Sequence, residues 1–414
     1  MFRRRWLSTI LLLTGVVAPL VLAVVAVVRR SRLTALVLDT GVLAAVQVIC
    51  ALFVLARVVA VVEAVVSRRP GSPKRAAAWV GAILVVAMVV PATWTVLRAR
   101  DLSSTIDEVF VSSGSSDTPL ADYSGVAATG EQGDGFSTVL LLGGDAGPGR
   151  WSLRTDTMIL VIIHRESGRM AMVSIPRNML GLEFPPMTPM ADEFPNGFSD
   201  LANAIYPYVY AHPDVAEFYK RGELQPEAIA LAQAISFSMG ITIDDYVLVD
   251  MLGFLEVVDA LGGVTVTLDK QIPMPGNVVG AKHEYPPTLG PGTVTLDGTL
   301  ALGFVRSRKA DSDYSRNGRQ RQLLSALAAQ TSGSDVLTRF PRISEIMRTY
   351  VRTSLSTDEF AFVVDRVRSG ASISESFGLN PPLVNPAQPD FDAIADFLTG
   401  IKDALANDYD FPFA

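Results

Sequence analysis

The sequence predicts an α/β fold: a three-layer α/β/α sandwich with a mixed sheet, preceded by three transmembrane helices. Three long apolar segments lie within the first 100 of the 414 residues. Two Val- and Ile-rich runs, 158–163 and 170–175, are separated by a polar turn that contains Ser167 and Gly168, which is the pattern of a β-hairpin. Beyond them strands and helices alternate without a strict period, which indicates a mixed sheet covered by helices.

The N-terminal segments are each long enough to cross a bilayer, which takes about 20 residues. They are residues 7–28, a span within 33–66, and residues 76–97. Arg57 and Glu63 lie toward the end of the middle segment. A functional site inside the membrane would also place charges there, but snorkelling of long side chains at a helix end is the simpler interpretation. We therefore expect a membrane anchor with three transmembrane helices over residues 1–100.

Positive charges in the short loops predict the orientation of this anchor. Arginines precede the first span at 3–5, and four Lys and Arg residues separate the second span from the third at 68–75. With both groups in the cytoplasm, residue 101 onward lies outside, although the arginine-containing loop at 29–32 then also lies outside. The first apolar run is too long for a signal peptide and has no clear cleavage site. We expect a multi-pass protein of the cell membrane, held in the lipid bilayer, with an extracytoplasmic domain.

Charge is unevenly distributed along the chain. Residues 1–100 contain 13 Lys and Arg against 2 Asp and Glu, a net charge of +11, and the whole chain carries −7, so residues 101–414 carry −18. An acidic domain argues against nucleic-acid binding, which needs a basic surface. The single cysteine, Cys50, and three scattered histidines argue against a disulfide framework and against zinc catalysis.

A polar, Gly- and Ser-rich stretch at 101–135 predicts a flexible linker, and the folded domain is expected over 136–410. Long loops are expected at 180–199 and 273–292. Besides the hairpin, strands are expected at 137–142, 246–250, 264–268 and 382–384. Helices are expected at 200–210, 226–239, 252–261, 297–304, 334–349, 357–368 and 391–406, and around 316–327. Gly240 and Gly262 are expected to end two of them.

Charged residues flank the hairpin at its open end. Arg154 and Asp156 lie at the start of the first run and Arg177 follows the second, so antiparallel pairing brings all three to one edge of the sheet. Such residues are most often solvated or joined in a simple ion pair. An arginine, a carboxylate and a second arginine can also bind an anion together with a metal ion. Asp145, which follows the Gly143-Gly144 pair at the end of the preceding strand, is a weaker signal of the same kind.

A second charged cluster lies between residues 306 and 321, where six cations occur in an otherwise acidic domain. Arg306 and Arg308 would point the same way in an extended segment. The residues that share one face of the helix that follows are Arg316, Arg319 and Gln320. A solvated basic face is the usual explanation of such a run, but this spacing is more ordered and indicates an anion-binding site.

Several motifs together resemble one known family. They are VLLLGGDAG, LRTDTMILVII, SIPRN, ANAIYPY, DYVLVDMLGFLEVVDALGGV, LDGTLALGFVRSRKADSDYSRNGRQRQ and VNPAQPDFDAIADFL. In this order, over roughly 136–410, the chain resembles the LytR–CpsA–Psr family of membrane-anchored cell-wall glycopolymer transferases, with an actinobacterial-like character. The several-span anchor is also similar to that of some members.

The resemblance implies that the domain binds a polyprenyl pyrophosphate carrying a glycopolymer and moves the polymer, with one phosphate, onto a peptidoglycan hydroxyl. By matching motifs, Asp145 and Asp156 would hold Mg²⁺, with Mn²⁺ as an alternative. The side chains that would bind the pyrophosphate are Arg154, Arg177, Arg306, Arg308, Arg316 and Gln320. The residues that would act in catalysis are Asp156, Arg154 and Arg308. A hard cation with oxygen ligands and arginine forks are what a pyrophosphate and its in-line displacement require.

The chain departs from the family pattern at two places. Many relatives have a Lys before the residue equivalent to Asn203, where this chain has Leu201-Ala202, and Asn178 replaces a commoner Asp. Candidates for the base that activates the acceptor are Asp311 and Asp313. Two alternatives stay open: a hydrolase of the same lipid, and a non-catalytic regulator that binds lipid-linked anions. The polymer itself, whether teichoic-acid-like, arabinogalactan-like or capsular, is not specified by the sequence.

Overall fold

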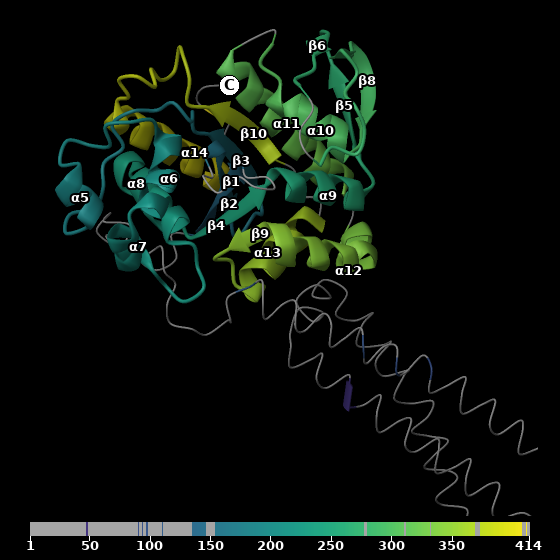
Figure 1. Ribbon diagram of the computed structural model, residues 1–414, viewed down its shortest axis with the longest axis horizontal. Coiled ribbons are helices and arrows are strands. Elements are labelled where there is room, and N and C mark those ends of the chain that lie inside the picture. Colours follow the sequence, from purple (N-terminus) through teal and green to yellow (C-terminus); the bar gives the residue numbers. More distant parts are fainter. Residues whose placement is uncertain are drawn as a thin grey trace, which may run out of the picture. The chain divides into compact units, whose positions relative to one another are not determined.

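Figure 1 shows the computed structural model of the chain. Contacts divide the chain into two compact units, Met1–Glu108 and Val109–Ala414. The residues that the structure describes are 135–145, 154–276, 280–309, 312–331, 333–368 and 373–407, with isolated residues 47, 48, 90, 93, 97, 110 and 411. The predicted spans and the linker at 101–135 lie almost entirely outside them. Among these described residues, no helix has both the length and the apolarity needed to span a membrane.

The centre of the second unit is a mixed sheet of six strands in the order β10-β3-β2-β1-β4-β9. Its strands are β1 (Phe136–Gly144), β2 (Thr155–His164), β3 (Met170–Ser174), β4 (Asp245–Asp250), β9 (Val351–Thr353) and β10 (Ile373–Gly378). β1 and β4 are parallel, as are β3 and β10, and the other neighbours are antiparallel. The predicted α/β fold with a mixed sheet is therefore confirmed.

The predicted hairpin is the β2–β3 pair. Leu160 lies opposite Val173, and the turn contains Gly168 at a φ of 73°, which the missing Cβ of glycine allows. All of β3 and most of β2 are buried. Continuous apolar runs are typical of strands that are covered on both faces, and this expectation is also confirmed.

Helices α8 (Pro226–Met239) and α14 (Phe391–Asn407) pack on one face of the sheet (Figure 1). Leu140 and Leu160 from the strands share a buried core there with Ile235 and Ile401 from the two helices. Gly240, at a φ of 61°, ends α8 as predicted. The segments next to α8 are α5 (Pro189–Glu193), η3 (Ala202–Ala204), α6 (Ile205–Ala211) and α7 (Pro213–Tyr219).

Helices α11 (Asp313–Gln330) and α13 (Thr357–Arg368) cover the opposite face. Alternate residues of a strand point to opposite faces, so Ser137 and Ser174 point away from the core around Leu140. Ser174 accepts a hydrogen bond from Arg321 of α11 at 2.9 Å, and Ser137 donates one to Glu359 of α13 at 2.9 Å. The sheet therefore carries helices on both faces.

A smaller layer flanks α11 with its own apolar core around Val266, Leu296 and Phe304. Its elements are α9 (Met251–Leu261), β5 (Val264–Leu268), β6 (Ile272–Pro273), β7 (Thr288–Leu289), β8 (Gly292–Leu296), α10 (Gly298–Arg306) and α12 (Gly333–Tyr350). The strand predicted at 264–268 is confirmed, but it pairs with β8 rather than joining the main sheet.

Three details of the predicted elements are wrong. Residues 382–384 form a turn, in which Val384 N donates to Asn380 O at 3.2 Å, and the strand lies upstream as β10. The expected loop at 180–199 contains α5, whose start is capped by the Thr188 hydroxyl. The helix expected from residue 200 begins with the short turn η3.

The strand directions bring several segment ends to one edge of the sheet. β1, β3, β4 and β10 all end at the edge where β2 begins. Ligands of open α/β sheets bind at the carboxyl ends of the strands. Arg154, Asp156 and Arg177, the three residues predicted to share one edge of the sheet, lie at this edge, and so does Asp145.

Candidate functional site

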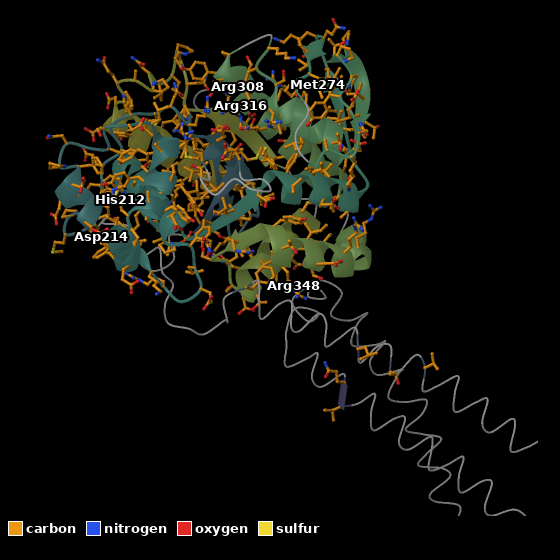
Figure 2. The ribbon with its side chains drawn as sticks, viewed as in Figure 1. His212, Asp214, Met274, Arg308, Arg316 and Arg348 are labelled. Carbon is orange, nitrogen blue, oxygen red and sulfur yellow. The ribbon has the colours of Figure 1, made fainter. Side chains whose placement is uncertain are left out.

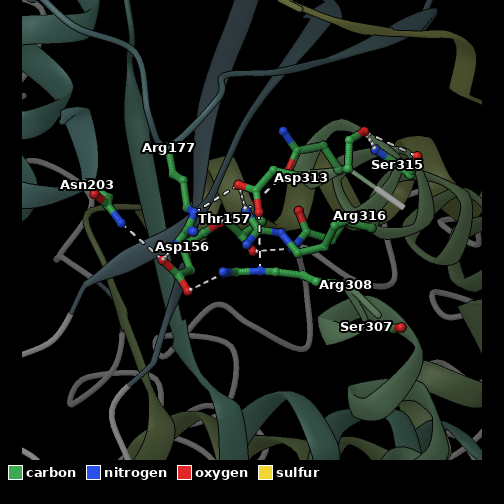
Figure 3. A network of polar contacts seen from close by, with 12 residues as sticks. Asp156, Thr157, Arg177, Asn203, Ser307, Arg308, Asp313, Ser315 and Arg316 are labelled. Carbon is green, nitrogen blue, oxygen red and sulfur yellow. Dashed lines mark hydrogen bonds and ion pairs between the residues drawn. The ribbon is translucent and has the colours of Figure 1, made fainter. Parts of the chain in front are cut away.

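Asp156 lies at the centre of a cluster of charged side chains at this edge (Figure 3). Its Oδ1 accepts hydrogen bonds from Arg177 Nη1 at 2.8 Å and from Asn203 Nδ2 at 3.0 Å. Its Oδ2 lies 3.4 Å from Arg308 Nη2. Asn203 is fully buried, and its backbone N–H donates to Arg177 O at 3.2 Å. Asp156 and Arg177, both predicted site residues, therefore bond to each other directly and are also linked through Asn203, which bonds to Asp156 by its side chain and to Arg177 by its backbone.

Asp313, the first residue of α11, contacts the same arginines (Figure 3). Its Oδ2 accepts a hydrogen bond from Arg177 Nε at 2.9 Å and lies 3.2 Å from Arg316 Nη2, and its Oδ1 lies 3.2 Å from Arg308 Nε. Ser312 caps this helix, which fixes Asp313 at the first turn. Three arginines thus share two carboxylates, Asp156 and Asp313, and the five groups carry a net charge of +1.

Arg316 is the most buried member of the cluster, at 2% exposed. Its Nη2 donates to the backbone oxygen of Asp156 at 3.0 Å. Its Nε and Nη1 are buried without a hydrogen-bond partner among the described residues. Figure 2 shows Arg316 near Arg308, with which it shares Asp313. Two N–H groups of a buried cation therefore have no acceptor in the described part of the chain, which is costly unless a further anion is supplied.

Thr157, the residue after Asp156, faces the other side of the sheet. Its hydroxyl accepts a hydrogen bond from Gln320 Nε2 of α11 at 2.8 Å. Gly143 lies directly opposite on β1, and a Cβ at that position would lie 2.8 Å from the Cβ of Thr157. The glycine therefore makes room for the side chain of Thr157. The side chain of Gln320 therefore contacts β2 through Thr157 and does not contact Asp156.

Asp145 and Arg154 are joined through the backbone. Asp145 Oδ1 accepts a hydrogen bond from Arg154 N at 2.8 Å, and Asp145 N donates to Arg154 O at 3.1 Å. Arg154 is exposed, and within the described part of the chain its guanidinium has no ion pair. Both residues therefore lie at the predicted edge, one residue from β1 and from β2, but outside the contacts of Asp156.

The prediction that Arg306 and Arg308 point the same way is wrong. Arg306 is the last residue of α10, whereas Arg308 lies beyond its C-cap, Ser307, so the two are not on one extended strand. Burial raises the pKa of the Tyr285 phenol, and the charge of the neighbouring Arg306 offsets part of that rise. Arg319 donates to the backbone oxygens of Phe304 and Ser307, which closes the end of α10. Arg306 therefore lies away from the cluster because α10 continues as far as this residue, and Arg319 because its guanidinium bonds to the end of α10.

The cluster changes the ionisation of its members. Burial raises the pKa of Asp156, but the hydrogen bond and charge of Arg177, with the charges of Arg316 and Arg308, outweigh it and hold that pKa below its usual value. Burial lowers the pKa of Arg177, but its contacts with Asp156 and Asp313 raise it overall. Burial lowers the pKa of Arg316 to about 10. At neutral pH Asp156 is therefore ionised and both arginines are charged.

The residues predicted to hold a divalent cation fit one by their chemistry. Asp145 and Asp156 supply carboxylate oxygens from adjacent strand ends, and Mg²⁺ is commonly bound by one or two carboxylates together with substrate phosphates. Both oxygens of Asp156 are engaged by Arg177, Asn203 and Arg308. Cation binding would therefore accompany a turn of these donors toward another anion. Within the described ranges, no group of three or more His, Cys, Asp or Glu residues could hold a metal ion by itself.

The sequence does not predict that two members of the cluster bind there. It marks Asn203 only as the residue that follows the position of a lysine in many relatives, and Asp313 only as a candidate base. Both oxygens of Asp313 are engaged by guanidinium groups, so neither is free to take a proton in this arrangement. The one feature of the sequence that indicates the position of Asp313 is the preceding Ser312, a residue type that caps helices and so places Asp313 in the first turn. Asp311, the other candidate base, lies outside the described residues.

The fold and site define a class of protein: a mixed α/β domain that gathers arginines around carboxylates at the carboxyl edge of its sheet, suited to binding an anion. Compared with known families, residues 109–376 match the model of the LytR_cpsA_psr family. The chain belongs to this family, which confirms the resemblance drawn from the motifs.

Individual relatives are similar over part of their length. Polyisoprenyl-teichoic acid–peptidoglycan teichoic acid transferase TagU of Oceanobacillus iheyensis is 30% identical over 227 residues, 53% of this chain and 59% of the relative. Biofilm regulatory protein A of Streptococcus mutans is 26% identical over 230 residues, 53% of this chain and 51% of the relative. The chain thus spans between half and three fifths of the length of these two relatives.

Solved structures are similar at lower identity. The crystal structure of B. subtilis TagV has a TM-score of 0.46 and 23% identity, over 66% of this chain and 98% of that chain. The structure of TagT bound to LI-WTA has a TM-score of 0.44 and 22% identity, over 67% of this chain and 93% of that chain.

Proposed function

We propose that the protein is a phosphotransferase that attaches a glycopolymer, carried on a polyprenyl pyrophosphate, to peptidoglycan through a phosphodiester bond. The observation that carries the proposal is the convergence of Arg177, Arg308 and Arg316 on two carboxylates of the described residues, among which two N–H groups of Arg316 find no acceptor. A net positive site with free guanidinium donors matches a diphosphate, whose oxygens accept paired N–H donors. The name of the relative TagU, a teichoic acid transferase, supports the same class of reaction.

In the proposed reaction an acceptor hydroxyl oxygen attacks the phosphorus that carries the polymer. A new P–O bond forms, the bond from that phosphorus to the bridging oxygen breaks, and polyprenyl phosphate leaves with the electron pair. The hydroxyl proton is released to solvent. Arg177, Arg308 and Arg316 turn from the two carboxylates to the phosphate oxygens and stabilise the charge that develops on them. The exposed Arg154 is assigned to the same diphosphate by its place at the edge.

A divalent cation, Mg²⁺ or Mn²⁺, would be held by Asp145 and Asp156 and would supply further neutralisation of the diphosphate. In this proposal Asp156 first binds arginines and then, once the substrate is bound, binds the cation. Without substrate it holds Arg177 and Arg308, and with substrate its oxygens are released by those arginines. Arg306 and Gln320 stay candidates for substrate binding. Arg306 would act through its positive charge, and Gln320 through its hydrogen bond to Thr157.

The location of the substrates follows from the predicted anchor. A polyprenyl carrier lies in the lipid bilayer and peptidoglycan lies outside it, so a domain over 136–410 tethered by three spans would face both. Localisation in the cell membrane, with this domain extracytoplasmic, and the actinobacterial-like character stay predictions.

The proposal is tested with the purified full chain in lipid nanodiscs. A labelled lipid-linked glycopolymer and peptidoglycan fragments are supplied with Mg²⁺, and the polymer-linked fragment is separated and counted. Asp156→Ala and Arg308→Ala are expected to abolish this product while both variants insert and fold. The matched control is Arg342→Gln, which removes an exposed arginine paired with Glu256 far from the site. Full transfer by both site variants would refute the proposal.

The same assay separates the two alternatives. Release of free phosphorylated polymer without a linked fragment would identify a hydrolase with water as the acceptor. Binding of the lipid without turnover during long incubation would identify a regulator, the class that the name of the Streptococcus mutans relative suggests. Addition of EDTA tests the requirement for a divalent cation, and loss of the linked product is expected.

A further inference from the structure

Arg321 of α11 belongs to the basic stretch of the sequence but lies outside the contacts of Asp156. Its Nη1 donates to the Ser174 hydroxyl at 2.9 Å, and its Nε is buried without a hydrogen-bond partner. Within the described part of the chain it forms no ion pair. The neighbouring arginines Arg177 and Arg308, by contrast, each contact two carboxylates. Among the described residues, the Ser174 hydroxyl is therefore the hydrogen-bond partner of Arg321.

This arrangement is costly for a structural arginine. The side chain of Arg321 is half-buried, and burial, which no carboxylate of the described residues opposes, lowers its pKa. A buried charge is normally paired, because its lost hydration has to be replaced. The domain carries a net charge of −18 over residues 101–414, so carboxylates are abundant, yet the described ones do not reach this guanidinium. An arginine that is partly exposed and lacks an anion is prepared to accept one from a ligand.

The surroundings of Arg321 place it at the same sheet edge as Asp156. Ser174 is the last residue of β3, and Gly378, directly opposite, is the last residue of β10. A Cβ on Gly378 would lie 3.1 Å from Arg321 Nη1 and 2.1 Å from Asn380 Oδ1, so the guanidinium uses space that only a glycine leaves. Asn380 also presents an amide beside it.

The spacing along the edge relates this position to the diphosphate site. Gln320, adjacent to Arg321 in α11, contacts Thr157 at the start of β2, whereas Ser174 lies opposite Ile159, two residues further along that strand. Two residues of a strand span roughly 7 Å and adjacent strands are about 5 Å apart. The Arg321–Ser174 contact therefore lies one strand closer to β10 than the Gln320–Thr157 contact and roughly 7 Å further along the strands.

We propose that Arg321 and the Ser174 hydroxyl form a second oxyanion subsite, which takes a phosphodiester group of the glycopolymer donor beyond its pyrophosphate. The inference rests on the proposed function. An arginine fork and a hydroxyl are suited to phosphate oxygens. The subsite orients the donor polymer along the sheet edge toward β10, and it makes the protein selective for polymers that carry a phosphodiester near the reducing end.

The test compares two donors that differ by one charge. The first is a short-chain prenyl pyrophosphate bearing a neutral disaccharide, and the second is the same compound extended by one sugar-phosphate unit. Dissociation constants are measured by calorimetry with the full chain in nanodiscs and Mg²⁺. The wild type is expected to bind the extended donor about tenfold or more tightly than the neutral one, the usual effect of one charge-assisted contact. In Arg321→Gln this ratio is expected to fall to about one, and Arg321→Lys is expected to restore part of it.

Each other result overturns the inference in a recognisable way. If Arg321→Gln keeps the wild-type ratio, the anion is bound elsewhere. If it weakens both donors equally, Arg321 supports the fold of the diphosphate site, and a thermal unfolding scan beside the control Arg342→Gln shows the loss of stability. If the ratio stays but the KM for peptidoglycan fragments rises, the anion belongs to the acceptor. If the wild type binds neither donor, the proposed function itself fails.

Discussion

Removing the contacts of a side chain in a binding site usually weakens ligand binding, but we expect Asp313→Asn to strengthen the binding of a diphosphate. Asp313 contacts Arg177, Arg308 and Arg316 at 2.9–3.2 Å, and these are the groups proposed to bind the diphosphate. The amide keeps the size of the side chain and removes its charge, so the net charge of the cluster rises from +1 to +2. The variant is therefore expected to bind a diphosphate more tightly while it folds less stably.

The magnitude follows from Coulomb's law. One extra unit charge at about 5 Å from a phosphate contributes about 3 kcal/mol at an effective dielectric constant of about 20, and about 0.8 kcal/mol in water. The side chains of Asp313 and Arg308 are 24% and 44% exposed, which favours the lower half of this range. A gain of about 1–2 kcal/mol corresponds to roughly five- to thirtyfold in the dissociation constant. Loss of the partly exposed ion pairs is expected to lower the free energy of unfolding by about 1 kcal/mol.

The assay is calorimetric titration with inorganic pyrophosphate in EDTA at low ionic strength, paired with thermal unfolding. The gain is expected to shrink as salt is added, because the charges are screened. The control is Glu217→Gln, which removes the same charge from an exposed surface pair with Lys220. Weaker or unchanged pyrophosphate binding by Asp313→Asn, or an equal gain in the control, would refute the view that Asp313 competes with the ligand.

Three further predictions follow from named residues. Gly143→Ala brings a Cβ to 2.8 Å from Thr157 and is expected to lower the free energy of unfolding by about 1–3 kcal/mol, measured by urea titration; an unchanged midpoint would contradict the close contact. Arg316→Met is expected to reduce transfer about 10²-fold or more but to leave the unfolding temperature close to that of the wild type, because a poorly paired buried cation is removed; a large loss of stability would contradict this. Burial raises the pKa of Asp245 to about 7, above its value in the unfolded chain, so its contribution to stability is complete below about pH 4 and is lost as the pH rises through about 7. Asp245→Asn should therefore be the more stable protein at pH 8 by a few kcal/mol, with the advantage disappearing at pH 4, and equal curves for the two proteins would contradict it.

The parts of the fold that local physics determines were predictable. The β2–β3 hairpin follows from two apolar runs and a Ser-Gly turn, and α8 ends at Gly240, where the chain turns to a positive φ. The edge that unites Asp156 and Arg177 follows from antiparallel pairing alone. The position of β10 did not follow, because ISESFG lacks an apolar pattern and becomes a strand only by pairing with β3.

The sequence predicts most of the residues at the site, but it does not predict which of them contact one another. Arg306 and Arg308 were expected together because their spacing fits an extended segment, but α10 includes Arg306 and turns it toward Tyr285. Asp313 joins Arg308 and Arg316, which are close to it in the sequence, to Arg177, which is 136 residues away, and sequence spacing does not reveal such a contact. The buried donors of Arg316 are likewise a property of packing, which only the folded chain reveals.

A structure of the chain with a short-chain prenyl pyrophosphate bound will show whether Arg177, Arg308 and Arg316 bind the diphosphate. We expect phosphate oxygens within hydrogen-bond distance of all three guanidinium groups, with Asp313 no longer bridging them. A diphosphate bound elsewhere, with the three arginines still held by Asp156 and Asp313, would contradict it.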